Sequence, residues 1–276
     1  MRLNLVIFLA GVSLIGCLEF DPTLTRKAVI LQATNSNNAY TLINKAFAPR
    51  GGAIEAPECG HWDFGPHITQ AFDKILGKHV FRFHIHRDKD NDRCIKFDRQ
   101  RNEIKVFSAS PPHLKAKKGN VFTYNWKFRL DKLFQASRRF THLHQIKAVG
   151  GPCDGMPLIT LSARKGIRGG PDKFELNYGE CSKQNTISTT NLQPFLGQWI
   201  EATQQISYGE NGKYSVSLKS VTTNETLFVY KDDSVRMWKT GAQFCRPKWG
   251  IYRSLADKDN LRDEIVDFAD IRISYR

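Results

Sequence analysis

Short segments in which apolar and polar residues alternate run through most of this chain, and they constrain its fold more than any other feature. The clearest is Lys78–Arg87, in which Phe81, Phe83 and Ile85 share one face and polar side chains share the other. A period of two is typical of a β-strand with one buried face. Turn residues separate these segments roughly every eight to twelve residues, the spacing of a sandwich or barrel. The pattern predicts an all-β, single-domain jelly roll whose concave face forms a groove for an extended polymer.

Further strands are expected along the chain after residue 50. They are predicted at Arg99–Phe107, Val121–Leu130, Thr141–Gly151, Pro157–Ala163, Phe174–Tyr178, Trp199–Ile206, Tyr214–Leu218, Thr226–Tyr230, Arg246–Tyr252 and Glu264–Tyr275. The preceding segment, residues 18–50, is less regular. Within it Ala39–Ala46 fits either a helix or a strand, and the whole segment fits either a structural strand or a trimmed pro-segment. We expect the jelly-roll domain to occupy residues 51–276.

Residues 1–17 have the organisation of a signal peptide. Arg2 is followed by the apolar run Leu5–Ile15 and then by the small residues Gly16 and Cys17, which is a charged region, a hydrophobic region and a cleavage zone in order. A bacterial lipobox ending at Cys17 is an alternative that ranks below simple secretion. The run is short for a bilayer span, and no later stretch is long and apolar enough. We therefore expect a secreted, extracellular protein without a membrane span.

Five cysteines follow Cys17, and a secreted chain is expected to pair most of them. Order and loop context favour pairing Cys153 with Cys181 and Cys59 with Cys94, which leaves one cysteine over. No spacing matches the paired CxxC pattern of a zinc site.

The chain carries 41 Lys and Arg against 27 Asp and Glu, a formal net charge of +14. Such an excess favours a nucleic acid, an acidic glycan or an anionic membrane surface as partner; a basic surface that serves only solubility is the alternative. The basic residues recur inside strand segments and form no recognised nucleic-acid-binding motif. Together with the signal peptide, this favours an acidic polysaccharide over a nucleic acid. The oligomeric state has no signature in the sequence.

Three predicted strands place polar residues side by side. Their polar faces carry Gln145 and Lys147 on the first strand, Arg101, Glu103 and Lys105 on the second, and Lys248, Gly250 and Tyr252 on the third. Strict alternation puts His142 and His144 on the opposite face of the first strand. In one sheet, the three strands would form a cationic floor that contains one phenol.

This floor suits β-elimination on a polyuronate, a sugar chain with a carboxylate on C5. The enzyme must neutralise that carboxylate, stabilise the enolate-like charge that develops, take the C5 proton and protonate O4. Arginine, lysine and glutamine side chains can neutralise the carboxylate. A tyrosine can move both protons when neighbouring cations favour its phenolate, and Lys248 and Arg101 are the cations expected near Tyr252.

Other chemistries fit less well. Glycoside hydrolysis needs two facing carboxylates, and neither Glu103 nor Glu175 lies in an acidic constellation. Glu103 between two cations is better explained as an ion-pair partner that orients Arg101. No GxSxG, HExxH or P-loop pattern occurs.

The histidines have less specific explanations. Arg82, His84 and His86 form either an ordinary solvent face or one rim of the same groove, and we include them as weaker substrate-binding candidates. His61 and His67 are expected to be loop histidines rather than metal ligands. The aspartates of residues 88–92 lack the glycine and distal glutamate of a calcium loop, so a β-turn is favoured and no metal ligand is predicted.

Three stretches together resemble secreted β-jelly-roll polysaccharide lyases, most of all the glucuronan lyase family, polysaccharide lyase family 20. They are DRQRNEIK (Asp98–Lys105), FTHLHQIKAVGG (Phe140–Gly151) and RPKWGIYRS (Arg246–Ser254). The layout also looks like that of family 7 alginate lyases and heparin lyase I, where an R-x-E, a Q-x-H and a K-x-G-x-Y strand line the cleft of a concanavalin-like sandwich. The order fits across roughly residues 55–275. Lys147 replaces the histidine of the Q-x-H motif, which argues against alginate-lyase behaviour.

The resemblance implies a lyase that cleaves a glucuronan-like polysaccharide. It implies that Arg101 and Gln145 neutralise the carboxylate, that Lys147 and Lys248 add positive field, and that Tyr252 is base, acid or both. No cofactor is required, although family members can carry a structural calcium ion away from the chemistry. The alternative is a lectin-like jelly roll that binds acidic glycans without cleaving them.

Overall fold

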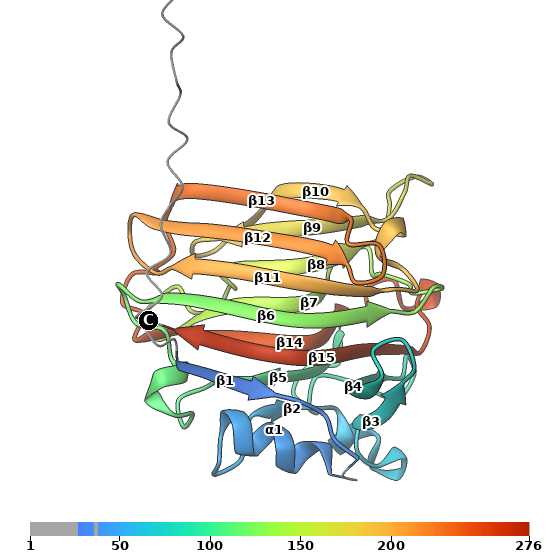
Figure 1. Cartoon of the computed structure of the whole chain (residues 1–276). Coiled ribbons are helices and arrows are strands. Elements are labelled where there is room, and N and C mark those ends of the chain that lie inside the picture. Colours follow the sequence, from blue (N-terminus) through green and yellow to red (C-terminus); the bar gives the residue numbers. More distant parts are fainter. Residues whose placement is uncertain (1–26, 36–37, 276) are drawn as a thin grey trace, which may run out of the picture.

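Antiparallel strands form two sheets that stack face to face (Figure 1). The computed structural model describes residues 27–35 and 38–275. Within them, the first sheet has the order β13 (Thr226–Val235), β12 (Gly212–Ser220), β11 (Trp199–Ser207), β6 (Val121–Leu130), β15 (Glu264–Tyr275), β4 (Lys78–Ile85) and β3 (Ile68–Asp73), and β1 (Lys27–Leu31) also pairs with β15. The prediction of an all-β sandwich is confirmed.

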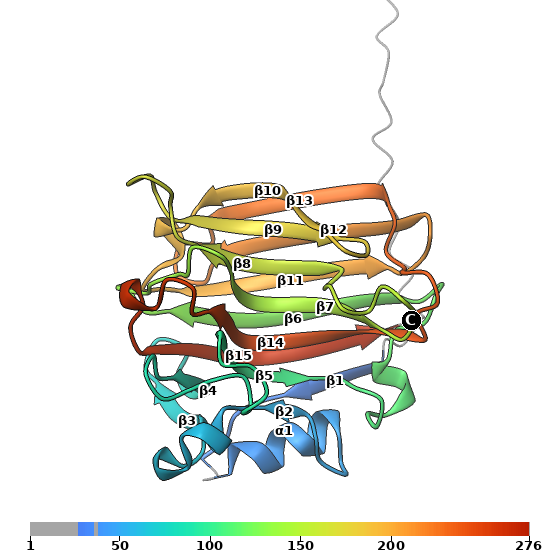
Figure 2. The same ribbon diagram turned by 180° about the vertical axis from the view of Figure 1, so that it is seen from behind.

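The second sheet is seen from its outer side in Figure 2. Its order is β10 (Gln184–Asn191), β9 (Lys173–Gly179), β8 (Ile159–Arg164), β7 (Thr141–Val149), β14 (Phe244–Ser254), β5 (Arg99–Lys105) and β2 (Ile54–Glu55). One α-helix, α1 (Ala39–Phe47), is described, together with 3-10 turns at Glu58–Gly60, Trp62–Phe64, Pro112–Leu114, Gln193–Phe195 and Lys258–Asn260.

The core lies between the sheets and follows from the alternation in the strands. In β6 every second residue is buried, which sends Phe122, Tyr124, Trp126 and Phe128 inward. They meet aromatic residues of the second sheet, and Trp126 lies edge-on to Trp249 of β14. Fully burying each large apolar side chain contributes about 1.5–3 kcal/mol, so the stacked aromatic residues account for much of the sandwich's stability.

Residues 39–47 form a helix, which settles the alternative left open for Ala39–Ala46. The Asn38 side chain accepts a hydrogen bond from the Thr41 backbone N–H at 2.9 Å and caps the helix start. Ile43 and Phe47 are completely buried, and the Phe47 ring stacks on Trp249 with centroids 5.8 Å apart. The helix thus packs into the same core as the sheets. The predicted signal peptide, residues 1–17, lies outside the described residues.

Both predicted disulfides are confirmed: Cys59 is bonded to Cys94, and Cys153 to Cys181. Cys245 is the unpaired cysteine among the described residues, and it is buried in the core. None of the helices described in the structure has the length and apolar character needed to cross a membrane.

Replacing Phe47 tests how firmly α1 belongs to the folding unit. We expect Phe47→Ala to lower the free energy of unfolding by about 3–5 kcal/mol, because it removes a buried ring from its contact with Trp249. Lys45→Ala, on the exposed face of the same helix, should change it by about 0.5 kcal/mol or less. Denaturant unfolding followed by tryptophan fluorescence measures both. Equal effects of the two substitutions would show that the helix is only loosely attached.

Candidate active site

The three strands that carry the lyase-like motifs are neighbours in the second sheet. Strand β14 lies between β7 and β5, so its residues face both partners. Lys248 pairs with Gln145 on one side and with Lys105 on the other, and Tyr252 pairs with Arg101. The structure therefore brings the predicted R-x-E, Q-x and K-x-G-x-Y residues together on the outer face of this sheet.

Gly250 makes this close pairing possible. Its φ is +144°, and a Cβ at this position would lie 2.1 Å from the backbone oxygen of Asn102 on β5. Any larger residue would push β14 away from β5, so the glycine of the K-x-G-x-Y motif has a steric role.

A buried carboxylate, Glu103, is the centre of the polar network on this face. It has no exposed surface, and it accepts hydrogen bonds from Arg101, Gln145 and Lys248. Each donor comes from a different strand. Lys248 also forms an ion pair with Glu55 of β2. Its ammonium group therefore contacts two buried carboxylates, Glu55 and Glu103.

The central part of the expected cationic floor is nearly neutral, which corrects the sequence-based picture. Three carboxylates, Glu55, Asp92 and Glu103, pair with four cations, which are Arg93, Arg101, Lys105 and Lys248. The three motifs alone do not predict this pairing, because Glu55 lies on β2 and Asp92 lies in a loop, both outside the motifs. A buried cation must be paired, since an isolated one is costly to desolvate.

The cations keep the central carboxyl groups ionised. Burial by itself raises the pKa of Glu103, but Lys248 and Arg101 outweigh burial and hold that pKa below its usual range. The same balance holds for Glu55, where burial is opposed by Lys248, Arg101 and Lys105, and the pKa is again lowered. The network is therefore a fixed set of charges at neutral pH.

Two arginines hold the Tyr252 ring and hydroxyl. The guanidinium of Arg101 lies over the ring, 3.6 Å from its centroid. Arg99 Nη1 donates a hydrogen bond to the Tyr252 hydroxyl at 3.0 Å. Arg101 is itself clamped by Asp92, through Nε at 3.0 Å. The phenol is thus held by one guanidinium over its ring and by another at its oxygen.

His142 also faces Tyr252, and here the prediction from alternation was wrong. The register of β7 shifts between His142 and His144 on both of its neighbours. This bulge adds a residue and turns His142 to the outer face, with its ring centroid 5.9 Å from that of Tyr252. His144 stays in the core, stacked on Trp126.

Hydrogen bonds assign the tautomer of His142. Its Nδ1 lies 2.7 Å from the Ser162 hydroxyl, which in turn donates to Thr160. Because that hydroxyl proton is used, Nδ1–H donates to Ser162 and the Nε2 atom keeps its lone pair. Burial lowers the pKa of His142 to about 3. The ring is therefore neutral, and Nε2 can accept a hydrogen bond.

Lys147 lies at the other end of the floor, paired across the strands with Arg246. Arg246 and Tyr252 are six positions apart on β14, about 20 Å at the rise of a strand. Within residues 27–35 and 38–275, no carboxylate forms an ion pair with Lys147 or Arg246, and the buried Nε of Arg246 has no hydrogen-bond partner. Two uncompensated cations therefore lie side by side.

The proximity of Arg246 also affects the pKa of Lys147. Burial, followed by the charges of Lys248, Arg246 and Arg101, lowers the pKa of Lys147 to about 8. An anion bound between Lys147 and Arg246 would relieve their repulsion. Arg246 was not singled out from the sequence, although it opens the third motif.

Arg82, His84 and His86 do not join the floor. Arg82 lies on the first sheet, where it binds Asp267 of β15 at 3.1 Å. His84 contacts the Thr69 hydroxyl at 2.7 Å, and His86 turns toward Asp90 in a separate cluster. The alternation of β4 was correctly recognised, but β4 belongs to the other sheet.

Comparisons with known proteins agree on the fold. No protein-family model and no curated protein matches this sequence. Among solved structures, an endo-β-1,4-glucuronan lyase from the fungus Trichoderma reesei matches with a TM-score of 0.52 at 14% identity, covering 80% of this chain and 93% of that one. A PL-14 alginate lyase from Aplysia kurodai gives a TM-score of 0.57 at 11% identity, with coverages of 88% and 97%.

A family 7 alginate lyase gives a TM-score of 0.52 at 11% identity and covers 80% of this chain and 91% of its own. At these identities the likeness concerns the fold. The chain therefore has the β-jelly-roll fold of the polysaccharide lyases that its three motifs resemble.

The Lys147 ammonium provides a direct check of this electrostatic arrangement. Nuclear magnetic resonance of labelled lysine side chains should show a signal with a midpoint near pH 8, against an ordinary value of about 10.4, and Lys147→Gln should remove it. The signal of Lys239, whose pKa is also lowered to about 8 by burial, should remain. Arg246→Gln should move the midpoint upward, because it removes a repelling charge. Since the unfolded chain keeps this proton to higher pH, the group's contribution to stability should rise from pH 8 to about 10. An unshifted midpoint in Arg246→Gln would contradict the pairing.

Proposed function

We propose that this chain is a secreted lyase that cleaves a uronate-containing, glucuronan-like polysaccharide by β-elimination. The observation that carries the proposal is the Tyr252 hydroxyl, which takes a hydrogen bond from Arg99 beside the stacked Arg101 and the neutral His142. The shared fold of known lyases supports it. The two disulfides are consistent with an extracellular location.

Carboxylate neutralisation falls to Arg99 in this arrangement. Arg101 is engaged by Asp92 and Glu103, and Gln145 donates to Glu103, so both act by positioning other groups. Among the described residues, Asp98 is the one carboxylate in an ion pair with Arg99, and its side chain is 66% exposed. Exposed ion pairs contribute little, so Arg99 can exchange Asp98 for a substrate carboxylate while it stays beside Tyr252.

The Tyr252 hydroxyl is the group available for the two proton transfers. The C5 proton must go to a base as the C4–O4 bond breaks, and O4 must receive a proton, which leaves a C4–C5 double bond in the product. Tyr252 serves as base, acid or both. The neutral His142 ring is a weak base because burial lowers its pKa, so its Nε2 accepts a hydrogen bond from the substrate beside Tyr252.

The Lys147–Arg246 pair extends the site along β14. Its distance from Tyr252 is longer than one sugar ring, so it binds the carboxylate of another unit in the same polymer. Lys248, Lys105 and Glu103 lie between the two positions and hold them at a constant spacing. This arrangement favours a polyanionic chain over a single uronate.

Two substitutions test the chemistry. Tyr252→Phe should lower kcat by about 10²–10⁴-fold, the usual contribution of acid–base groups, while binding of the polymer persists. His142→Gln should lower kcat less, because His142 only accepts a hydrogen bond. The assay is the rise in ultraviolet absorbance from the unsaturated uronyl product on a panel of polyuronates. Tyr230→Phe, on the other sheet, should leave kcat unchanged. Retention on an acidic-polysaccharide column without any absorbance rise would instead support a lectin-like module.

A charge substitution tests the distal position. Lys147→Gln combined with Arg246→Gln should raise KM for the polymer about tenfold or more and change kcat little, because the pair acts on binding away from the reacting atoms. The exposed Lys219→Gln on β12 is the control and should leave KM unchanged. A matching loss in kcat with KM preserved would mean that the pair acts at the reacting sugar.

A further inference from the structure

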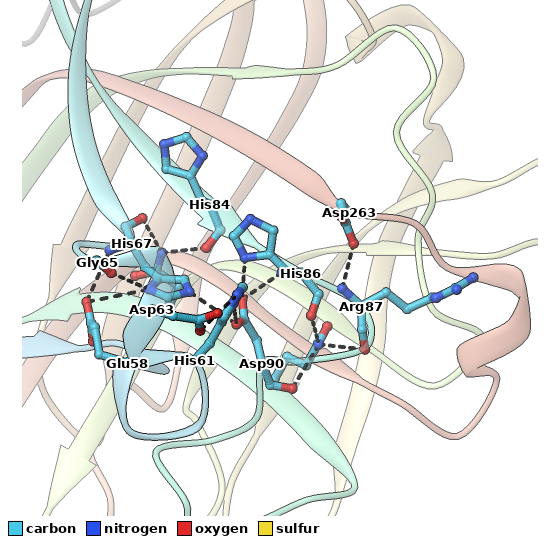
Figure 3. A network of polar contacts seen from close by, with 12 residues as sticks. Glu58, His61, Asp63, Gly65, His67, His84, His86, Arg87, Asp90 and Asp263 are labelled. Atoms are coloured by element: carbon cyan, nitrogen blue, oxygen red, sulfur yellow. Dashed lines mark hydrogen bonds and ion pairs between the residues drawn. The ribbon is translucent and has the colours of Figure 1, made fainter.

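Three histidines and one aspartate converge beside the candidate active site (Figure 3). His61 and His67 flank the turn before β3, and His86 and Asp90 follow β4. One ligand atom from each side chain lies within 4.8 Å of all the others. The sequence did not reveal this group because its members come from two segments of chain with no zinc-like spacing.

The distances match a small coordination shell. Asp90 Oδ1 lies 2.9 Å from His61 Nδ1 and 3.1 Å from His67 Nε2, and Asp90 Oδ2 lies 3.2 Å from His86 Nδ1. Tetrahedral zinc with bonds of 2.0–2.1 Å separates its ligand atoms by about 3.3 Å. The three nitrogen–oxygen distances are already close to that separation, so only the imidazoles need to approach one another.

The hydrogen-bond acceptors around the histidines favour a bound metal over a cluster held by protons alone. His67 is completely buried, and its Nδ1 lies 3.0 Å from the backbone oxygen of Gly65 while Nε2 faces Asp90. His61 has Asp90 beside Nδ1 at 2.9 Å, while Asp63 lies 3.7 Å from Nε2, beyond hydrogen-bond distance. Without a metal, the two acceptors beside His67 would require a proton on both of its ring nitrogens. With a metal, the outer nitrogen donates to its oxygen acceptor and the inner lone pair binds the ion.

The surroundings resemble the outer shell of a structural metal site. Ligand histidines usually donate their second N–H to a carboxylate or a backbone carbonyl, and the Gly65 carbonyl lies in that position, 3.0 Å from His67 Nδ1. The His86 backbone N–H donates to Asp90 at 2.6 Å. The Cys59–Cys94 disulfide joins the two ligand-bearing segments.

The set of donors identifies the class of ion. Three imidazoles and one carboxylate suit zinc or another late first-row divalent metal, whereas calcium and magnesium take oxygen ligands. Four protein ligands fill a tetrahedral shell and leave no open position, which indicates a structural site rather than a catalytic one.

We propose that His61, His67, His86 and Asp90 bind a structural zinc ion that fixes the loop over the candidate active site. Asp92, two residues after Asp90, holds Arg101, which stacks on Tyr252. The backbone N–H of Arg101 also donates to the Asn91 carbonyl at 3.4 Å. Zinc binding at Asp90 therefore stabilises the segment that orients Arg101.

The test measures metal content in the full secreted chain without an affinity tag. After dialysis against zinc and then metal-free buffer, elemental analysis should find about one zinc per chain in the wild type and in His113→Gln, whose histidine is exposed. Asp90→Asn and His61→Gln should bind zinc at least about tenfold more weakly. A chelator should lower the Tm of the wild type, and added zinc should restore it.

Cobalt substitution gives a readout that needs no variant. Co²⁺ in the wild-type site should produce the intense visible bands of tetrahedral coordination. Failure of the wild type to retain zinc, with no Tm change on chelation, would overturn the proposal and leave a hydrogen-bonded cluster. Equal zinc retention by His61→Gln and the wild type would overturn it as well, because the ion would then lie elsewhere on the surface.

Discussion

The Glu103 carboxylate is the group on which the outer face of the second sheet depends. It is fully buried, so its charge is stable only because Arg101, Gln145 and Lys248 donate to it from three neighbouring strands. Removing one partner from such a buried pair costs about 3–5 kcal/mol. The carboxylate therefore fixes the register of β5, β14 and β7, and with it the place of Tyr252.

This neutralisation changes the meaning of the chain's net charge of +14. Most cations of the three motifs form ion pairs with carboxylates of the protein itself, where they orient side chains. The charges left for an anionic polymer are those at the two ends of the floor, Arg99 beside Tyr252 and the Lys147–Arg246 pair. In the proposed function, polymer binding and chemistry therefore lie at different positions on the outer face of the second sheet.

The histidine cluster and the candidate active site meet in one loop. Asp90 faces the three imidazoles, and Asp92 holds Arg101. The Cys59–Cys94 disulfide closes this loop against the turn that carries His61. A loop fixed at both positions orders Arg101 before a substrate arrives, which reduces the entropy lost on reaching the reactive geometry.

The sequence by itself determined most of the strands and the shared face of Arg101, Lys248 and Tyr252, because a period of two is a local property of each strand. Cysteine order and loop context indicated both disulfide pairs, whereas β1, β2, β3 and β10 were not predicted. Only the tertiary structure decided what surrounds them. The bulge that turns His142 toward Tyr252 arises from pairing with β14 and β8. Glu55 and Asp92 neutralise the floor from outside its motifs, and Arg82 and His84 lie on the other sheet. Such contacts join residues that are distant in sequence. They form only in the folded chain, where a buried charge needs an opposite charge beside it.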